Sequence, residues 1–178
     1  MKQKRALGLT NKFLDDMGRK LSPLYFEGTF PCDVLLREYK PTREKKEKSI
    51  VFVNTSESIV PTGHYNALNI LWKSECVYLF DSLALGLVDP NIIEFIRRFL
   101  KQYPNFTLDY SPYPLQHLLN SAHCGIHSLA YLVSQDKHCG HSTEDFYSFF
   151  RPEPVLENDN LALQYLLHFI SNCYPVQK

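Results

Sequence analysis

The sequence predicts an α+β domain in which a short, mixed β-sheet packs against helices. Three segments in quick succession, 49–54, 64–72 and 75–82, carry the apolar patterns of strands. A further segment, 89–103, carries the pattern of a capped amphipathic helix. Because strands and helices do not alternate in regular βαβ order, an all-parallel α/β sheet is not expected. With 178 residues, the chain is expected to form a single domain over residues 1–178.

The N-terminal half is expected to supply one helix and then most of the sheet. Residues 9–20 can form a short helix with Thr10 or Asn11 near its cap. The aromatic segment 24–30 (LYFEGTF) is expected to be extended. The residues WKSE, between the second and third strands, have the length of a hairpin turn. We therefore expect those two strands to be antiparallel neighbours.

The C-terminal half is expected to be mainly helical. In the helix over 89–103, Asp89 is the expected cap and Pro90 takes the first helical position. Residues 106–110 (FTLDY) return as a strand. The apolar stripe of the 89–103 helix consists of Ile92, Ile93, Ile96, Phe99, Leu100 and Tyr103. Later helices are expected over 125–135, 142–150 and 158–172.

Composition indicates a folded protein with no net charge at neutral pH. Apolar residues make up 44% of the chain, with twelve Phe and eleven Tyr, so a sizeable core can form. Nineteen basic and nineteen acidic residues cancel, which argues against a dedicated polyanion binder. No apolar run approaches the roughly 18 residues of a membrane span. The five cysteines are scattered and odd in number, which we interpret as thiols in an intracellular, reducing compartment.

Basic residues are concentrated in two segments. Lys2, Lys4 and Arg5 lie in segment 2–5, and segment 37–48 reads REYKPTREKKEK. The simplest interpretation of such a run is a solvated loop. The alternative is a patch that contacts nucleic acid through phosphates.

A first interpretation of the stretch LNSAHCGIHSLAYL (119–132) is a zinc site. Four residues can be drawn as zinc ligands: Cys124, His127, Cys139 and His141. However, adjacent His–Cys pairs chelate poorly, and the apolar run SLAYLV is typical of a core. Structural zinc sites usually place their ligands in short knuckles on turns. A zinc-binding interaction module is therefore kept as an alternative function, and no metal is expected.

A second interpretation is a buried cysteine, and a third is a nucleophile. A lone cysteine on an apolar helix usually packs in the core. Cys124, however, precedes the helical pattern, after the good cap residues Asn120 and Ser121 and before Gly125. In the first turn of a helix, the dipole and the free N–H groups stabilise a thiolate. A nucleophile is expected at such a position.

A nucleophilic thiol needs a base, and the base needs a residue that orients it. His64 opens the second predicted strand, and Asp81 ends the third. In a hairpin these two residues lie at the same end, so Asp81 can accept the Nδ1–H of His64 and leave Nε2 for the thiol proton. Gln116, in a segment stiffened by prolines, can supply an oxyanion donor beside the backbone N–H of Cys124.

These motifs resemble the adenovirus proteinase (adenain) family, within the wider group of Ulp-type proteases of SUMO and ubiquitin-like proteins. The similarity lies in the order His, Asp, Gln, Cys, with TGHY at 62–65, YLFD at 78–81 and NSAHCG at 120–125. It extends over about residues 9–135. Three features depart from the adenain pattern: Asp81 stands where adenains carry Glu, Tyr65 replaces the usual Trp, and the Gln-to-Cys loop is one residue longer.

The resemblance implies a site, a fold and a reaction. Cys124 would be the nucleophile, His64 the general base and later acid, Asp81 the residue that orients His64, and Gln116 the oxyanion donor. The fold would be α+β, with a mixed sheet and the nucleophile at the N-terminus of a buried helix. The reaction would be that of a cysteine endopeptidase, which cleaves virion precursor proteins at small or glycine-containing sites through a thioester. The alternative is a Ulp-type deconjugase acting on a SUMO-like modifier.

The resemblance also sets expectations about partners. No cofactor is needed for the chemistry, and we expect a monomer without a membrane anchor that acts in the host nucleus and the virion. Adenain is activated by a viral peptide, through a disulfide, and by DNA. The corresponding segment here, PNFTLD (104–109), has no cysteine, so the disulfide route is not supported. Segments 2–5 and 37–48 are compatible with DNA.

Overall fold

The computed structural model describes residues 9–43, 46–59, 63–84, 89–117, 121–137, 139, 141–153 and 157–173. In chain order, the elements are α1 (Asn11–Leu21), β1 (Phe26–Pro31), α2 (Cys32–Glu38), β2 (Lys48–Asn54), β3 (Tyr65–Leu71), β4 (Cys76–Asp81), α3 (Pro90–Gln102), β5 (Thr107–Tyr110), the 3-10 turn η1 (Ser121–His123), α4 (Cys124–Ser134), α5 (Thr143–Ser148) and α6 (Asn158–Cys173).

The strands form one mixed sheet in the order β1-β2-β3-β4-β5. Strands β2, β3 and β4 are antiparallel neighbours, whereas β1 is parallel to β2 and β5 is parallel to β4. The predicted α+β class and the predicted hairpin are both confirmed. In the hairpin, Asn66 pairs with Asp81. His64, two residues before Asn66, therefore lies at the end of the sheet where β4 finishes.

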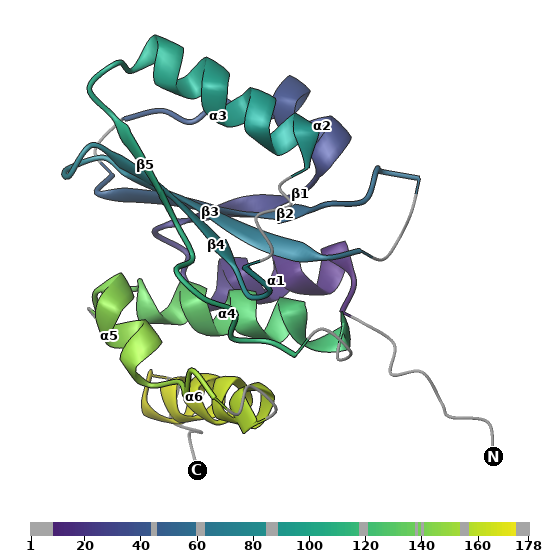
Figure 1. Cartoon of the computed structure of the whole chain (residues 1–178), viewed down its shortest axis with the longest axis vertical. Helices are drawn as coiled ribbons and strands as arrows, with labels where there is room; N and C mark the ends of the chain where they lie inside the picture. Colours follow the sequence, from purple (N-terminus) through teal and green to yellow (C-terminus); the bar gives the residue numbers. More distant parts are fainter. Residues whose placement is uncertain are drawn as a thin grey trace.

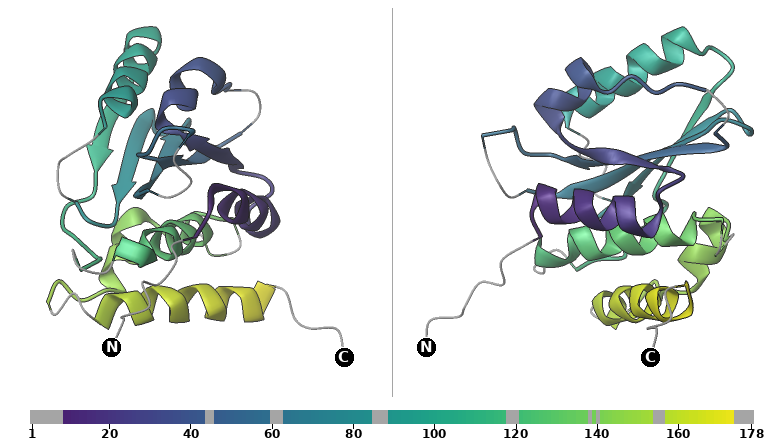
Figure 2. Two further views of the ribbon diagram at one scale, coloured as in Figure 1. Left: turned by 90° about the vertical axis from the view of Figure 1, so that its right-hand side faces the viewer. Right: turned by 180° about the vertical axis from the view of Figure 1, so that it is seen from behind.

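Helices cover both faces of the sheet. Helices α2 and α3 pack on one face, and α1 and α4 pack on the other, with α5 and α6 outside α4 (Figures 1 and 2). Each side has its own core. The smaller core, under α2 and α3, contains Trp72, Phe95 and Phe99. The larger core contains Phe80 and Tyr131, whose rings stack at a centroid distance of 4.6 Å. Helix α4 is thus an interior helix between the sheet and α6.

Side-chain caps explain where three of the helices begin. The Thr10 hydroxyl accepts from the backbone N–H of Phe13 at 3.2 Å, and the Asp89 carboxylate accepts from that of Asn91 at 2.8 Å. Ser142 and Asp145 form a reciprocal capping box at α5. Each cap satisfies donors that a helix end leaves unpaired. The predicted cap at Asp89 is confirmed, and of the two residues expected near the start of α1 the cap is Thr10.

The structure differs from the sequence analysis at two local points, a helix that was not predicted and a residue of α3 predicted on its apolar stripe. Helix α2 was not predicted, because the segment CDVLLRE is short and follows directly after a strand that ends in proline. In α3, Ile93 is 52% exposed, and Phe95 takes its place in the core. The buried side of α3 faces the sheet, and Ile93 lies beside that contact. The predicted helix is present, but its buried side is rotated relative to the predicted apolar stripe, so Phe95 is buried and Ile93 is not.

Candidate active site

Cys124 is the first residue of α4, one residue earlier than the predicted helix start. Its surface is 3% exposed, and its thiol lies 3.8 Å from the carbonyl oxygen of Gly63, the residue before His64. His123 occupies the N-cap position without a side-chain cap. Asn120, one of the two expected caps, lies outside the described residues, and η1 occupies 121–123. The thiol thus sits at the positive end of a buried helix.

Gly125 lets α1 approach the start of α4. A Cβ at this position would lie 3.2 Å from a Leu9 methyl group and 3.3 Å from both Leu14 methyl groups. Such contacts are tighter than ordinary packing, so a side chain here would displace α1 or α4. The glycine after the cysteine therefore has a packing role.

His64 and Asp81 are in direct contact. The Nε2 atom of His64 lies 2.6 Å from Oδ1 of Asp81. The pairing is as predicted, but the nitrogen is not: Nδ1 was expected on Asp81. Asp81 pairs with Asn66 and therefore lies diagonally from His64 across the hairpin. The contact with Asp81 uses Nε2, which leaves Nδ1 as the other nitrogen of the ring.

The surroundings of His64 favour its protonated form. Burial by itself lowers the pKa of His64, but the hydrogen bond to Asp81, then the hydrogen bond with Cys124, and the charges of both raise it to about 9. The imidazole is therefore an imidazolium at neutral pH. Asp81, in contact with the ring, and Cys124 are thus the two neighbours that raise the pKa of His64.

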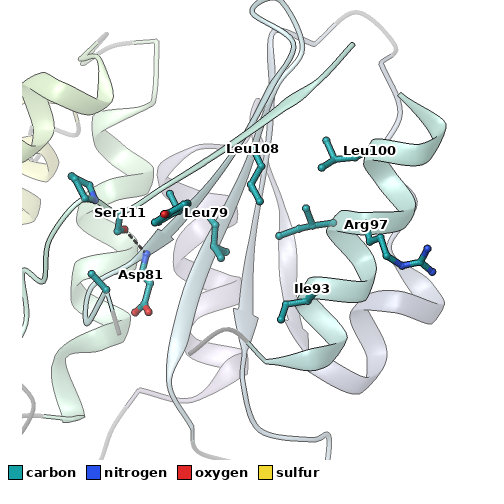
Figure 3. A pocket seen from close by; sticks show the side chains of 11 residues that line it. Leu79, Asp81, Ile93, Arg97, Leu100, Leu108 and Ser111 are labelled. Atoms are coloured by element: carbon teal, nitrogen blue, oxygen red, sulfur yellow. Dashed lines mark hydrogen bonds between the residues drawn. The ribbon is translucent and has the colours of Figure 1, made fainter. Parts of the chain in front are cut away.

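Asp81 is itself held in place from two sides. Its Oδ1 accepts a hydrogen bond from the backbone N–H of Leu83 at 2.9 Å. Its own backbone N–H donates to the Ser111 hydroxyl at 2.8 Å, as Figure 3 shows. The carboxylate therefore has a fixed direction before any substrate binds.

Gln116 is buried and tied to the residue after Asp81. The Ser82 hydroxyl donates to the side-chain oxygen of Gln116 at 2.7 Å, and the backbone N–H of Gln116 donates to the Ser82 carbonyl at 2.8 Å. Because the oxygen accepts from Ser82, the side-chain NH₂ group is directed away from Ser82 as a donor. Sequence reasoning selected Gln116 but missed Ser82, whose only signal was its position directly after Asp81.

A polar network supports the strand end that carries His64. Asn11 accepts hydrogen bonds from the Tyr65 hydroxyl at 2.7 Å and from the Asn54 amide at 2.9 Å. Burial, followed by the neighbouring Cys124, raises the pKa of Tyr65 to about 12. A Cβ at Gly63 would collide with the side-chain oxygens of Asn54 and Ser56. The sequence did not predict this network.

A cavity of about 560 Å³ opens beside Asp81, between α3 and the strands β4 and β5 (Figure 3). Its walls are mainly apolar, with Ile93, Leu100 and Leu108 among them, and the guanidinium of Arg97 points outward. It has space for apolar side chains. Of the four predicted site residues, Asp81 is the one that lines it.

The residues of the zinc alternative do not converge. His127 is fully buried and contacts Asp159, whereas Cys139 and His141 contact the Tyr165 hydroxyl, at 3.4 and 2.6 Å. Over the described parts of the chain, no group of three or more His, Cys, Asp or Glu side chains is arranged to hold a metal ion.

The basic segment 37–48 is largely engaged with partners inside the protein. Arg37, Arg43 and Lys46 pair with Glu38, Glu75 and Glu27. Lys48 donates to the backbone carbonyl of Gln135 at 2.9 Å. These contacts within the protein give no support to the interpretation of the segment as a patch that contacts nucleic acid. Segment 2–5 and residues 44–45 lie outside the described residues.

No protein-family model and no curated protein matches the sequence. Solved structures do match. The central domain of the uncharacterized Lpg1148 protein from Legionella pneumophila aligns with a TM-score of 0.54 and 10% identity, over 93% of this chain and 98% of that one. The SUMO protease Ulp1 with its catalytic cysteine oxidized to a sulfonic acid aligns with a TM-score of 0.51 and 14% identity, over 93% of this chain and 80% of that one. The ASFV protease aligns with a TM-score of 0.51 and 17% identity, over 73% of this chain and 46% of that one.

The chain has the fold of the Ulp-type cysteine proteases. At these identities the similarity establishes the fold, and the chemistry has to be argued from the side chains. Among the described residues, no helix is both long enough and apolar enough to cross a membrane.

Proposed function

We propose that the protein is a cysteine peptidase with Cys124 as nucleophile and His64 as its acid–base partner. One observation carries the proposal: His64 contacts the Asp81 carboxylate at 2.6 Å and also hydrogen-bonds Cys124, at the start of a buried helix. An imidazolium between a thiol and a carboxylate is the arrangement that activates a thiol for acyl transfer.

The proposed reaction has two halves. Cys124, resting as a thiolate beside the His64 imidazolium, attacks the carbonyl carbon of the scissile amide. The side-chain NH₂ of Gln116 and the backbone N–H of Cys124 would stabilise the oxyanion. His64 then protonates the leaving amine, and the thioester forms. In the second half, His64 takes a proton from water, which attacks the thioester and releases the acid. The chemistry uses no cofactor.

For the substrate class, we favour a viral precursor protein cleaved at small or glycine-containing sites. The low exposure of Cys124 supports small residues next to the scissile bond, because bulky ones would not reach the thiol. The order of the site residues and their motifs resembles adenain, which processes such precursors. On this proposal the protein acts inside the infected cell, as a monomer.

Deconjugation of a ubiquitin-like modifier is the second candidate. Its support is the similarity to the SUMO protease Ulp1 over most of both chains, together with an aspartate at position 81. Such modifiers enter as an extended C-terminal tail, which also suits a narrow approach to Cys124.

Two reagents distinguish the candidates. Peptides containing glycine at the cleavage site test endopeptidase action, and SUMO or ubiquitin with an electrophile at its C-terminus tests deconjugation. Cys124→Ala should abolish cleavage or labelling, and Cys76→Ala should leave it unchanged. Cleavage that survives in Cys124→Ala would refute the proposed nucleophile. Strong labelling by a modifier probe, with all peptides uncut, would favour the second candidate.

A further inference from the structure

The two histidines that flank Cys124 meet a single carboxylate from another helix. Nε2 of His127 lies 2.9 Å from Oδ1 of Asp159, and Nδ1 of His123 lies 3.7 Å from Oδ2 of Asp159. Asp159 belongs to the first turn of α6. Of the two, the His127 contact is a hydrogen bond, whereas Nδ1 of His123 lies at ion-pair distance and makes no hydrogen bond among the described residues.

The contact between His127 and Asp159 is buried, so its hydrogen bond cannot be replaced by one to water. The His127 side chain is 0% exposed and that of Asp159 is 5% exposed. A buried carboxylate is tolerated only where hydrogen bonds and nearby positive partial charges compensate for the lost water. His127 supplies a hydrogen bond, and the N-terminus of α6 supplies a favourable dipole for Asp159. Among the described residues, Nδ1 of His127 has no hydrogen-bond partner, so the hydrogen bond of the ring is made by Nε2.

The start of α6 is also fixed. Both polar atoms of the buried Asn158 side chain bond the backbone of Arg151, with the oxygen accepting at 3.0 Å and the amide donating at 2.7 Å. Asp159, the next residue, is therefore presented from an anchored position. In Figure 1, α6 lies along the side of α4 that faces away from the sheet.

The opposite side of α4 is tied to the strand of the base. The Ser128 hydroxyl donates to the backbone carbonyl of Tyr65 at 3.3 Å, and Tyr65 directly follows His64. The first turns of α4 are thus fixed toward the sheet by Ser128 and toward α6 by His127. Cys124 lies one turn before Ser128, on the same side of the helix.

We infer that Asp159 is a positioning residue, which holds the first turn of α4 through its hydrogen bond with His127 so that the Cys124 thiol is aligned with His64. This inference rests on the proposed function and extends it to the C-terminal helix. Asp159 acts by positioning and not through its charge. Its negative charge, near the N-terminus of α4, would by itself destabilise a thiolate at Cys124. If that charge effect dominated, removing the carboxylate would speed the reaction.

The test is the rate at which iodoacetamide alkylates each cysteine at neutral pH, followed residue by residue by mass spectrometry. Asp159→Ala should slow alkylation of Cys124 by about ten- to hundredfold, because a displacement of about 1 Å is enough for such a loss. Asp159→Asn, which keeps an acceptor for His127, should give a smaller loss. In both variants the rate of Cys76, on β4, should stay within about twofold of wild type.

Asp136 provides the matched control. It is a buried carboxylate just beyond the C-terminal end of the same helix, and it accepts from the Ser22 hydroxyl at 2.8 Å. Asp136→Ala and Asp136→Asn should lower the melting temperature about as much as the Asp159 variants do. They should leave the alkylation rate of Cys124 within about twofold of the wild-type rate. With a cleavable substrate, the Asp159 variants should lose kcat and retain KM.

Three results would overturn the inference: an unchanged Cys124 rate in Asp159→Ala and Asp159→Asn, a faster rate, or an equal loss in the Asp136 variants. Failure of the proposed function gives a different result. In that case, Cys124 of the wild-type protein reacts no faster than Cys76, or reacts as fast after His64→Ala, and the positioning inference falls with it.

Discussion

Nε2 of His64 contacts Asp81, and the ring's other nitrogen, Nδ1, is the one available to Cys124. Across the hairpin, Asp81 pairs with Asn66 and sits diagonally from His64. With Nε2 on Asp81, Nδ1 is the nitrogen left for proton exchange with the thiol. Asp81 is also the main source of the raised pKa of His64, ahead of Cys124.

Replacing Asp81 tests that electrostatic role. In the wild-type protein, kcat/KM should fall as pH rises through about 9, because His64 then loses the proton that it must donate. Asp81→Asn removes the charge that raises this pKa, so the upper limb should shift to lower pH. The maximum of kcat should fall by about hundredfold or more, since the ring also loses its orientation. A pH–rate profile measures both effects.

Asp109, exposed on β5, gives the matched control for that substitution. Asp109→Asn should leave the profile unchanged. An upper limb that stays near pH 9 in Asp81→Asn would show that Asp81 does not set the pKa of His64.

The same pair should make stability depend on pH. The folded pKa of His64, about 9, lies above its ordinary value of 6.5, so folding favours the protonated form. The resulting stabilisation is fully present below pH 6.5 and is lost as pH rises through about 9. In urea unfolding, the free energy of unfolding of the wild-type protein should therefore exceed that of Asp81→Asn by a larger amount at pH 6 than at pH 10. Equal differences at the two pH values would contradict this linkage.

The oxyanion donor is tested by Gln116→Ala. If the Gln116 amide stabilises the oxyanion, kcat should fall by about 10²- to 10³-fold with little change in KM. Ser82→Ala should cause a smaller loss, about tenfold or less, because it frees the amide to rotate without removing it. Steady-state kinetics of both variants on one substrate measure this order. A loss in Ser82→Ala that exceeds the loss in Gln116→Ala would contradict the proposed role.

Local sequence patterns were sufficient for most of the fold. The Asp89–Pro90 helix start, the hairpin turn and the apolar runs of the strands are short-range signals, and the structure contains each of these elements. The pairing of His64 with Asp81 was also predictable, because a hairpin places its two outer ends together.

The remaining features depend on contacts between distant residues. Ser82 and Gln116 are 34 positions apart, and His127 and Asp159 are 32 apart. No local pattern encodes such hydrogen bonds. The ring nitrogen on Asp81 is Nε2, and no local pattern of the sequence distinguishes it from Nδ1. Helix α2 is too short for its periodicity to be recognised.

Two glycines next to the site should respond differently to alanine. At Gly63, a Cβ would collide with the side chains of Asn54 and Ser56, and the following residue is His64. Gly63→Ala should therefore displace the imidazole and reduce kcat/KM by about tenfold or more. At Gly125, the heavy atoms nearest to the added methyl group are methyl carbons of Leu9 and Leu14, at 3.2 and 3.3 Å.

Gly125→Ala should accordingly cost stability, about 1–3 kcal/mol in the free energy of unfolding, with a smaller effect on kcat/KM than Gly63→Ala. Urea unfolding and kinetics on the same two variants separate the effects. Ser56→Gly, which removes one of the two colliding side chains, should partly restore activity to Gly63→Ala and leave Gly125→Ala unchanged. If Gly63→Ala retained full activity at unchanged stability, the approach of Asn54 and Ser56 to Gly63 would not be what positions His64.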